Sequence, residues 1–112
     1  MNDLYDRLTV TSRVLAERTG RDRHDVVVVL GSGLGEYAAG LEGAVAVSYE
    51  ELPGFPVPKA VGHGGTAYSV ETGANAVLLL AGRSHAYEGH SMDVVTFPVR
   101  TAVFSGARTV VL

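Results

Sequence analysis

The sequence contains no cysteine and only one lysine, Lys59. The absence of cysteine excludes disulfides and thiolate metal sites, and it agrees with a cytoplasmic location. The net charge of −3 comes with no basic patch of the kind that nucleic-acid-binding proteins use to neutralise phosphates. No apolar run approaches the roughly 20 residues that cross a bilayer, and the N-terminus lacks a secretory signal pattern. We therefore expect neither nucleic acid nor membrane among its partners.

Glycine, in contrast, is abundant, with 14 among 112 residues. The glycines cluster at 31–35, 62–65 and 82–89, mostly just after apolar runs. Proteins of the α/β class place their ligand-binding loops at such positions. The chain length fits one domain or part of one, and we interpret residues 1–112 as a portion of a single domain.

Hydrophobic patterning predicts an α/β order of elements. An apolar stripe from Leu4 through Leu8 and Thr11 to Leu15 predicts an amphipathic helix over residues 3–19. The unbroken apolar run 26–30 predicts a strand buried on both faces, after a turn in which we expect His24 to be solvated. An alternating, more exposed strand is expected at 44–49, and strands 66–71 and 76–81 should form a hairpin around the turn at 72–75.

A second helix is expected to begin near Thr96, with Pro98 in its first turn, and to end at Gly106. Its buried side would consist of Val99, Ala102, Val103 and Phe104. Residues 108–112 begin another strand, which should be a central strand with more sheet beyond it. This pattern predicts a domain that is incomplete at its C-terminal side.

The first candidate binding motif is Gly31-Ser32-Gly33-Leu34-Gly35, directly after a predicted buried strand. Glycines at such a turn let backbone N–H groups approach an anion, and Ser32 adds a hydroxyl donor. The dinucleotide fingerprint fails because Glu36 occupies its third glycine position, and the Walker loop fails for lack of a lysine. A tight strand exit without a ligand remains the alternative interpretation of this turn.

The second motif is the segment from Gly82 to His90, which follows another predicted buried strand. Arg83 can hold a phosphate bidentately, and His85 would project to the same side of an extended segment and donate to a phosphate oxygen. Tyr87 offers a flat face suited to a sugar, and Glu88 would orient Arg83 or His85. The alternatives are a purely structural polar loop or a metal site, although the H-x-x-E-x-H order differs from the helical H-E-x-x-H pattern of zinc sites.

A third motif, His63 between glycines in a proline-rich loop, suits a flap that closes over a ligand. A structural role for His63 is an equal alternative from the local sequence alone.

Taken together, these motifs resemble the trimeric class of purine nucleoside phosphorylases. The matching text is GSGLG at 31–35, LPGFP at 52–56, GHGG at 62–65, GRSHAYEG at 82–89 and TFPVR at 96–100. The match runs in order from about residue 4 to residue 112. In the relative that cleaves methylthioadenosine, an Arg-His-Gly stretch replaces Arg83-Ser84-His85, so this sequence is more similar to the purine nucleoside group.

The resemblance implies a three-layer α/β/α fold with a mixed central sheet, and phosphorolysis of purine nucleosides to the free base and ribose 1-phosphate. It implies that Ser32, Arg83 and His85 bind phosphate, with His85 also catalytic, and that His63 closes over it. It further implies that Tyr87 packs against the ribose. No metal or organic cofactor is expected, and the complete protein would be a cytoplasmic homotrimer with purine nucleoside and phosphate as its small-molecule partners.

The family residues that recognise the purine lie in its C-terminal half, for which this sequence has no counterpart. We therefore expect the isolated chain to lack phosphorolytic activity. Two other functions remain open from the sequence. One is a non-catalytic module that binds phosphate or a nucleotide, and the other is an assembly fragment that completes its sheet with another polypeptide through the strand ending at Leu112.

Overall fold

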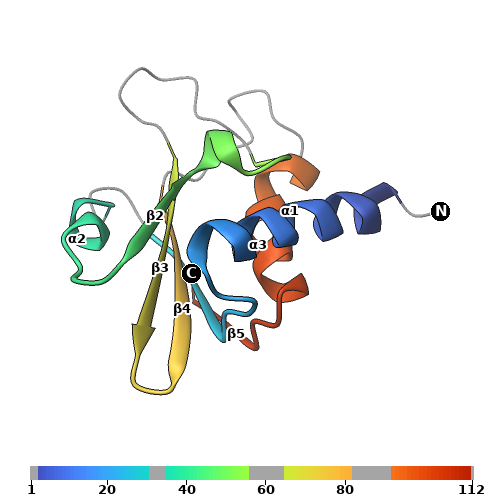
Figure 1. The fold of residues 1–112 in the computed structure, drawn as a ribbon. Helices are drawn as coiled ribbons and strands as arrows, with labels where there is room; N and C mark the ends of the chain where they lie inside the picture. Colours follow the sequence, from blue (N-terminus) through green and yellow to red (C-terminus); the bar gives the residue numbers. More distant parts are fainter. Residues whose placement is uncertain (1–2, 31–34, 56–64, 82–91, 112) are drawn as a thin grey trace.

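The computed structural model describes residues 3–30, 35–55, 65–81 and 92–111, without the side chains of 35–36 and 92–95. These residues form one five-stranded sheet in the order β2-β3-β4-β1-β5, with helices on both faces (Figure 1). The elements along the chain are α1 (Asp3–Thr19), β1 (Val26–Val29), α2 (Gly35–Ala39), β2 (Val45–Ser48), the 3₁₀ turn η1 (Tyr49–Glu51), β3 (Thr66–Thr72), β4 (Asn75–Ala81), α3 (Met92–Phe104) and β5 (Thr109–Val111).

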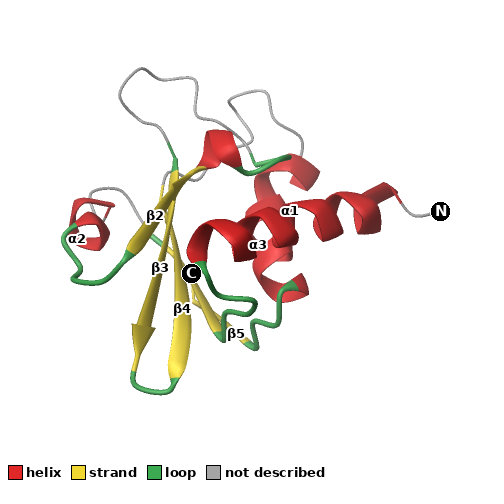
Figure 2. Ribbon diagram, viewed as in Figure 1, coloured by secondary structure: helices red, strands yellow, loops and turns green. Residues whose placement is uncertain are grey.

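The sheet is mixed. Strands β4, β1 and β5 run parallel, whereas β2, β3 and β4 form an antiparallel meander (Figure 2). The predicted hairpin is confirmed, and its turn contains Gly73 with φ +62°, a left-handed conformation that glycine adopts without strain. The predicted mixed α/β fold is therefore confirmed.

The larger hydrophobic core lies between the sheet and helices α1 and α3. Leu15 from α1 and Phe97 from α3 are each 1% exposed, and they pack on Val27 and Leu78 of the sheet, which are fully buried. Helix α1 follows the predicted stripe, with acidic residues in its first turn and Arg18 in its last, an arrangement that favours the helix dipole. This core fixes β1 and β4 side by side.

The opposite face of the sheet carries a smaller core. Its hydrophobic cluster consists of Ala38 of α2, Val70 and Leu79. Val28, Leu30 and Val77 of the same face remain half-buried. Strand β1 was predicted to be buried on both faces, and this is wrong for the α2 side, because a five-residue helix covers less of the sheet than α1 and α3 do.

Helix α3 differs from its prediction in two respects. It begins at Met92, not near Thr96, so that Pro98 lies inside the helix rather than in its first turn. Val103 and Phe104, predicted to be buried, are 48% and 40% exposed. The face of α3 that contacts the core carries Phe97, Thr101 and Ala102, and Val103 points away from it. Phe104 lies on the same stripe as Phe97, but it is the last residue of the helix and packs edge to face on the ring of Tyr5, which is itself 58% exposed.

Strand β2 deviates from the sequence prediction, whereas β5 forms near its predicted position. β2 ends at Ser48, and Tyr49 begins a 3₁₀ turn because Ser48 and Glu51 form a capping box. β5 forms where a strand was expected; it is the last strand of the described sheet, and all three of its residues are exposed. No helix among the described residues is long and apolar enough to span a membrane.

Candidate functional site

The segments that carry the predicted site residues are joined to strand ends on the same side of the sheet. Segment 31–34 follows Leu30, whose N–H donates to the carbonyl of Leu80 at 2.9 Å, and segment 82–91 follows Ala81 at the end of β4. Segment 56–64 ends just before β3, whose first residue Thr66 pairs with Ala81. Because β3, β4 and β1 are neighbours, and adjacent strands lie 4.7–4.9 Å apart, the three attachment points span about 10 Å.

Tyr49 holds both flanks of segment 56–64. Its backbone N–H donates to the carbonyl of Gly65 at 3.0 Å, on the C-terminal flank. Its ring meets the ring of Phe55, on the N-terminal flank, edge to face at 5.0 Å between centroids. Phe55 also packs edge to face on Phe97 of α3, at 6.2 Å. The two ends of the predicted flap are therefore fixed to the main core.

The predicted site residues themselves lie outside the described residues. This applies to Ser32, His63, Arg83, His85, Tyr87 and Glu88. The structure thus brings together the strand ends from which their segments depart, and their roles remain predictions. Among the described residues there is no group of three or more side chains that could hold a metal ion.

The close packing around Gly65 leads to a first prediction. A Cβ atom on Gly65 would lie 2.6 Å from Cε2 of Tyr49, a ring that is 1% exposed. Since a buried ring cannot move aside cheaply, Gly65→Ala is expected to destabilise the chain by about 1–3 kcal/mol and to change the near-ultraviolet circular dichroism of the tyrosines. Thermal unfolding and near-ultraviolet spectra would measure both effects.

Gly43 provides the control for this substitution. A Cβ atom there meets nothing within 4 Å, although its φ of +80° makes any side chain strained. Gly43→Ala should therefore lower the melting temperature through backbone strain alone and leave the aromatic spectrum unchanged. An unaltered aromatic spectrum in Gly65→Ala would contradict the role given to Tyr49.

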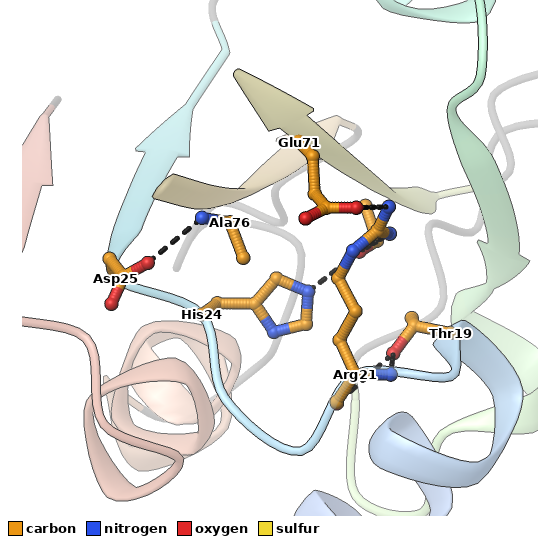
Figure 3. A network of polar contacts seen from close by, with 7 residues as sticks. Thr19, Arg21, His24, Asp25, Glu71 and Ala76 are labelled. Carbon is orange, nitrogen blue, oxygen red and sulfur yellow. Dashed lines mark hydrogen bonds and ion pairs between the residues drawn. The ribbon is translucent and has the colours of Figure 1, made fainter. Parts of the chain in front are cut away.

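At the opposite ends of these strands, a polar cluster joins the α1–β1 connection to β3 (Figure 3). Ser69 lies at its centre. Nη1 of Arg21 donates to the Ser69 hydroxyl at 2.7 Å, and Nε2 of His24 lies 2.7 Å from the same oxygen. Arg21 also contacts Glu71 at 3.3 Å, and Asp25 accepts a hydrogen bond from the backbone N–H of Ala76 at 2.8 Å.

His24 was predicted to be solvated, and this is wrong, because it is 1% exposed. Its Nδ1 atom is buried without a hydrogen-bond partner. Burial is the main cause that lowers the pKa of His24 from 6.5 to about 4; the positive charge of Arg21 contributes to this shift, and Asp25 opposes it. No local pattern could have predicted this contact, because Ser69 is 45 residues away along the chain.

Comparisons with known proteins agree with the fold and with the motifs. No family model matches the chain. The purine nucleoside phosphorylase of Mycobacterium leprae is 53% identical over 102 residues, which cover 90% of this chain and 38% of that protein. The mouse (Mus musculus) purine nucleoside phosphorylase is 36% identical over 108 residues, covering 96% of this chain and 37% of that protein.

Solved structures give the same result. Isoform 2 of purine nucleoside phosphorylase from Schistosoma mansoni, in complex with cytosine and ribose-1-phosphate, superposes with a TM-score of 0.82 at 25% identity, over 95% of this chain and 37% of that one. The Schistosoma mansoni enzyme in complex with inosine gives 0.78 at 26% identity, over 94% and 36%. The chain spans about two fifths of the length of the curated relatives it matches. In sequence and in fold, this chain is therefore a fragment of a purine nucleoside phosphorylase.

Proposed function

We propose that this chain supplies the phosphate- and ribose-binding part of a site for the phosphorolysis of purine nucleosides. The observation that carries the proposal is the attachment of three motif-bearing segments to the ends of three neighbouring strands. Ligands of open α/β sheets bind at strand ends of this kind. Ser32, Arg83 and His85 would share one phosphate, with His63 closing over it.

The proposed residues suit the chemistry. A phosphate dianion held beneath the anomeric carbon would stabilise positive charge on the ribose as the purine departs, and would then form the new bond to that carbon. Arg83 supplies a permanent cation with a planar pair of donors, and His85 supplies a further donor. Positioning the two reactants can lower a barrier by roughly 7–11 kcal/mol. Tyr87 would hold the ribose and Glu88 would orient its cationic neighbours.

We further propose that catalysis requires the part of the domain that this chain lacks. The base-recognising residues expected from the family have no counterpart in these 112 residues. The complete protein would be a cytoplasmic homotrimer that needs phosphate as co-substrate and no cofactor. The other candidate function is a phosphate-binding module or assembly fragment without activity of its own.

The isolated chain is expected to bind phosphate weakly and to release no hypoxanthine from inosine. Weak binding follows from an incomplete set of donors, and inactivity follows from the missing base site. A phosphate titration followed by ¹H–¹⁵N NMR, together with a coupled assay for hypoxanthine, measures the two properties separately. Turnover like that of the complete enzymes would disprove the inactivity, and absence of any phosphate response would disprove the binding site.

A further inference from the structure

Thr11 in α1 makes a long-range contact where a helical threonine often makes a local one. It lies in the apolar stripe of the helix and is 1% exposed. A threonine inside a helix can donate to the carbonyl four residues before it, and Thr9, Thr19 and Thr101 do so at 2.8, 2.8 and 2.9 Å. The hydroxyl of Thr11 donates instead to the carbonyl of Pro53, 42 residues away along the chain. This bond joins α1 to the residues that follow η1.

The residues after Pro53 are held by α3. Gly54 has a φ of +86°, and a Cβ atom on it would lie 2.8 Å from Cε2 of Phe97, so its backbone lies directly against that buried ring. Phe55 packs edge to face on the same ring. Residues 53–55 are thus connected to α1 by a hydrogen bond and to α3 by aromatic packing.

On the α1 side, side-chain packing does not substitute for this hydrogen bond. A surface cavity of about 230 Å³ lies beside it, lined by Asp6, Arg7, Val10, Thr11, Pro53 and Gly54. Pro53 and Gly54 are both exposed, so this turn buries little apolar surface against the helix. The Thr11 hydroxyl is therefore the contact that determines where Pro53 lies relative to α1.

This turn leads into the segment that carries one of the proposed phosphate ligands. Phe55 directly precedes segment 56–64, which contains His63. We propose that Thr11 is a positioning residue for the phosphate site. By holding the Pro53 carbonyl, it fixes the point from which the segment leaves the core.

The effect of Thr11 on phosphate binding is local. It acts through His63, whereas Arg83 lies in a segment that follows β4, whose end is fixed by its pairing with β3. The inference rests on the proposed function, and phosphate binding by the wild-type chain tests that function separately.

Thr11→Val tests the inference, because it keeps the shape of the side chain and removes the donor. Valine suits the apolar stripe of α1, so the far-ultraviolet circular dichroism should be unchanged. Phosphate affinity, measured by NMR titration, should fall about three- to tenfold, because a displaced His63 keeps only part of its hydrogen bond to the anion. In the absence of phosphate, exchange of the Phe55 amide, which donates to the carbonyl of Leu52 at 3.1 Å, should become faster. Thr11→Ser returns the hydroxyl and should restore both properties.

Side-chain signals identify the route of the effect. In the wild type, phosphate should shift the ring signals of His63 and the Nε signal of Arg83. In Thr11→Val, compared at the same bound fraction, the His63 shift should become smaller while the Arg83 shift is retained. A general loss of stability would not separate the two signals in this way.

Thr19→Val is the matched control. Thr19 is a second buried threonine of α1, but its hydroxyl donates to the carbonyl of Leu15 within the helix. The variant should lower the melting temperature and leave phosphate affinity unchanged.

Two results would overturn the inference while the proposed function stands. One is an unchanged phosphate affinity in Thr11→Val, and the other is an equal reduction of the His63 and Arg83 shifts. A loss of affinity in Thr19→Val as large as in Thr11→Val would also overturn it, because any weakening of α1 would then suffice. Absence of a phosphate response in the wild type would instead refute the proposed function, and this inference with it.

Discussion

Replacing Arg83 by alanine is expected to reduce phosphate affinity by about 100-fold, which makes an already weak interaction undetectable. Each hydrogen bond to a charged group contributes about 1.5–3 kcal/mol, and a bidentate guanidinium makes two of them. Since 1.4 kcal/mol corresponds to a tenfold change in affinity, loss of both bonds removes at least two orders of magnitude. Phosphate titration of the two proteins by ¹H–¹⁵N NMR measures the difference.

Two further variants separate a specific site from general charge. Arg83→Lys keeps the charge but loses the planar fork, so it should bind with intermediate affinity. Arg108→Ala removes a guanidinium from an exposed position just before β5. The backbone N–H of Arg108 donates to the carbonyl of Asp25 at 2.9 Å, so this residue lies at the opposite ends of the strands from the proposed phosphate site. It should bind phosphate as the wild type does. An unchanged affinity in Arg83→Ala would refute the assignment of the site.

The second large effect concerns the dependence of stability on pH. Burial lowers the pKa of His24 from 6.5 to about 4, so the unfolded chain takes up a proton at a higher pH than the folded chain does. Folding stability is therefore unaffected by His24 above pH 6.5, and falls as the pH drops from 6.5 to about 4. The total loss from this one residue is about 3 kcal/mol over that interval. Urea unfolding at several pH values measures it.

Substitutions in the cluster test the assignment to His24. His24→Gln removes the titrating group, so the difference in pH dependence from the wild type should account for one proton over this interval. Ser69→Ala removes the hydroxyl that contacts both Arg21 and His24. It should lower stability at neutral pH by about 1–3 kcal/mol while the pH-dependent loss remains. Identical pH profiles of the wild type and His24→Gln would contradict a buried neutral histidine.

Periodicity in the sequence predicted the elements that local patterns determine. The stripe of α1 and the apolar run of β4 are buried as expected, with Leu15, Leu78 and Leu80 at most 2% exposed. The turn at 72–75 is short and contains a glycine, which is a local signal for a hairpin. These features were predictable because the residues that determine them are neighbours along the chain.

Features that depend on distant segments were not predictable in the same way. The burial of His24 depends on Ser69, in another strand, and the exposure of Val103 depends on which face of α3 the sheet covers. The candidate site is an intermediate case. The placement of the glycines was enough to predict the motifs. That their segments leave neighbouring strand ends follows instead from the parallel pairing of β1 with β4, in which Val29 lies beside Leu80.

The central claim is that one inorganic phosphate binds where three segments leave neighbouring strands. A crystal structure of the chain with phosphate tests it most directly. The account predicts a single anion, with the Ser32 hydroxyl, the Arg83 guanidinium and the His85 ring each within hydrogen-bonding distance, about 3 Å, of its oxygens. A structure in which these three side chains lie too far apart to contact one anion would contradict it.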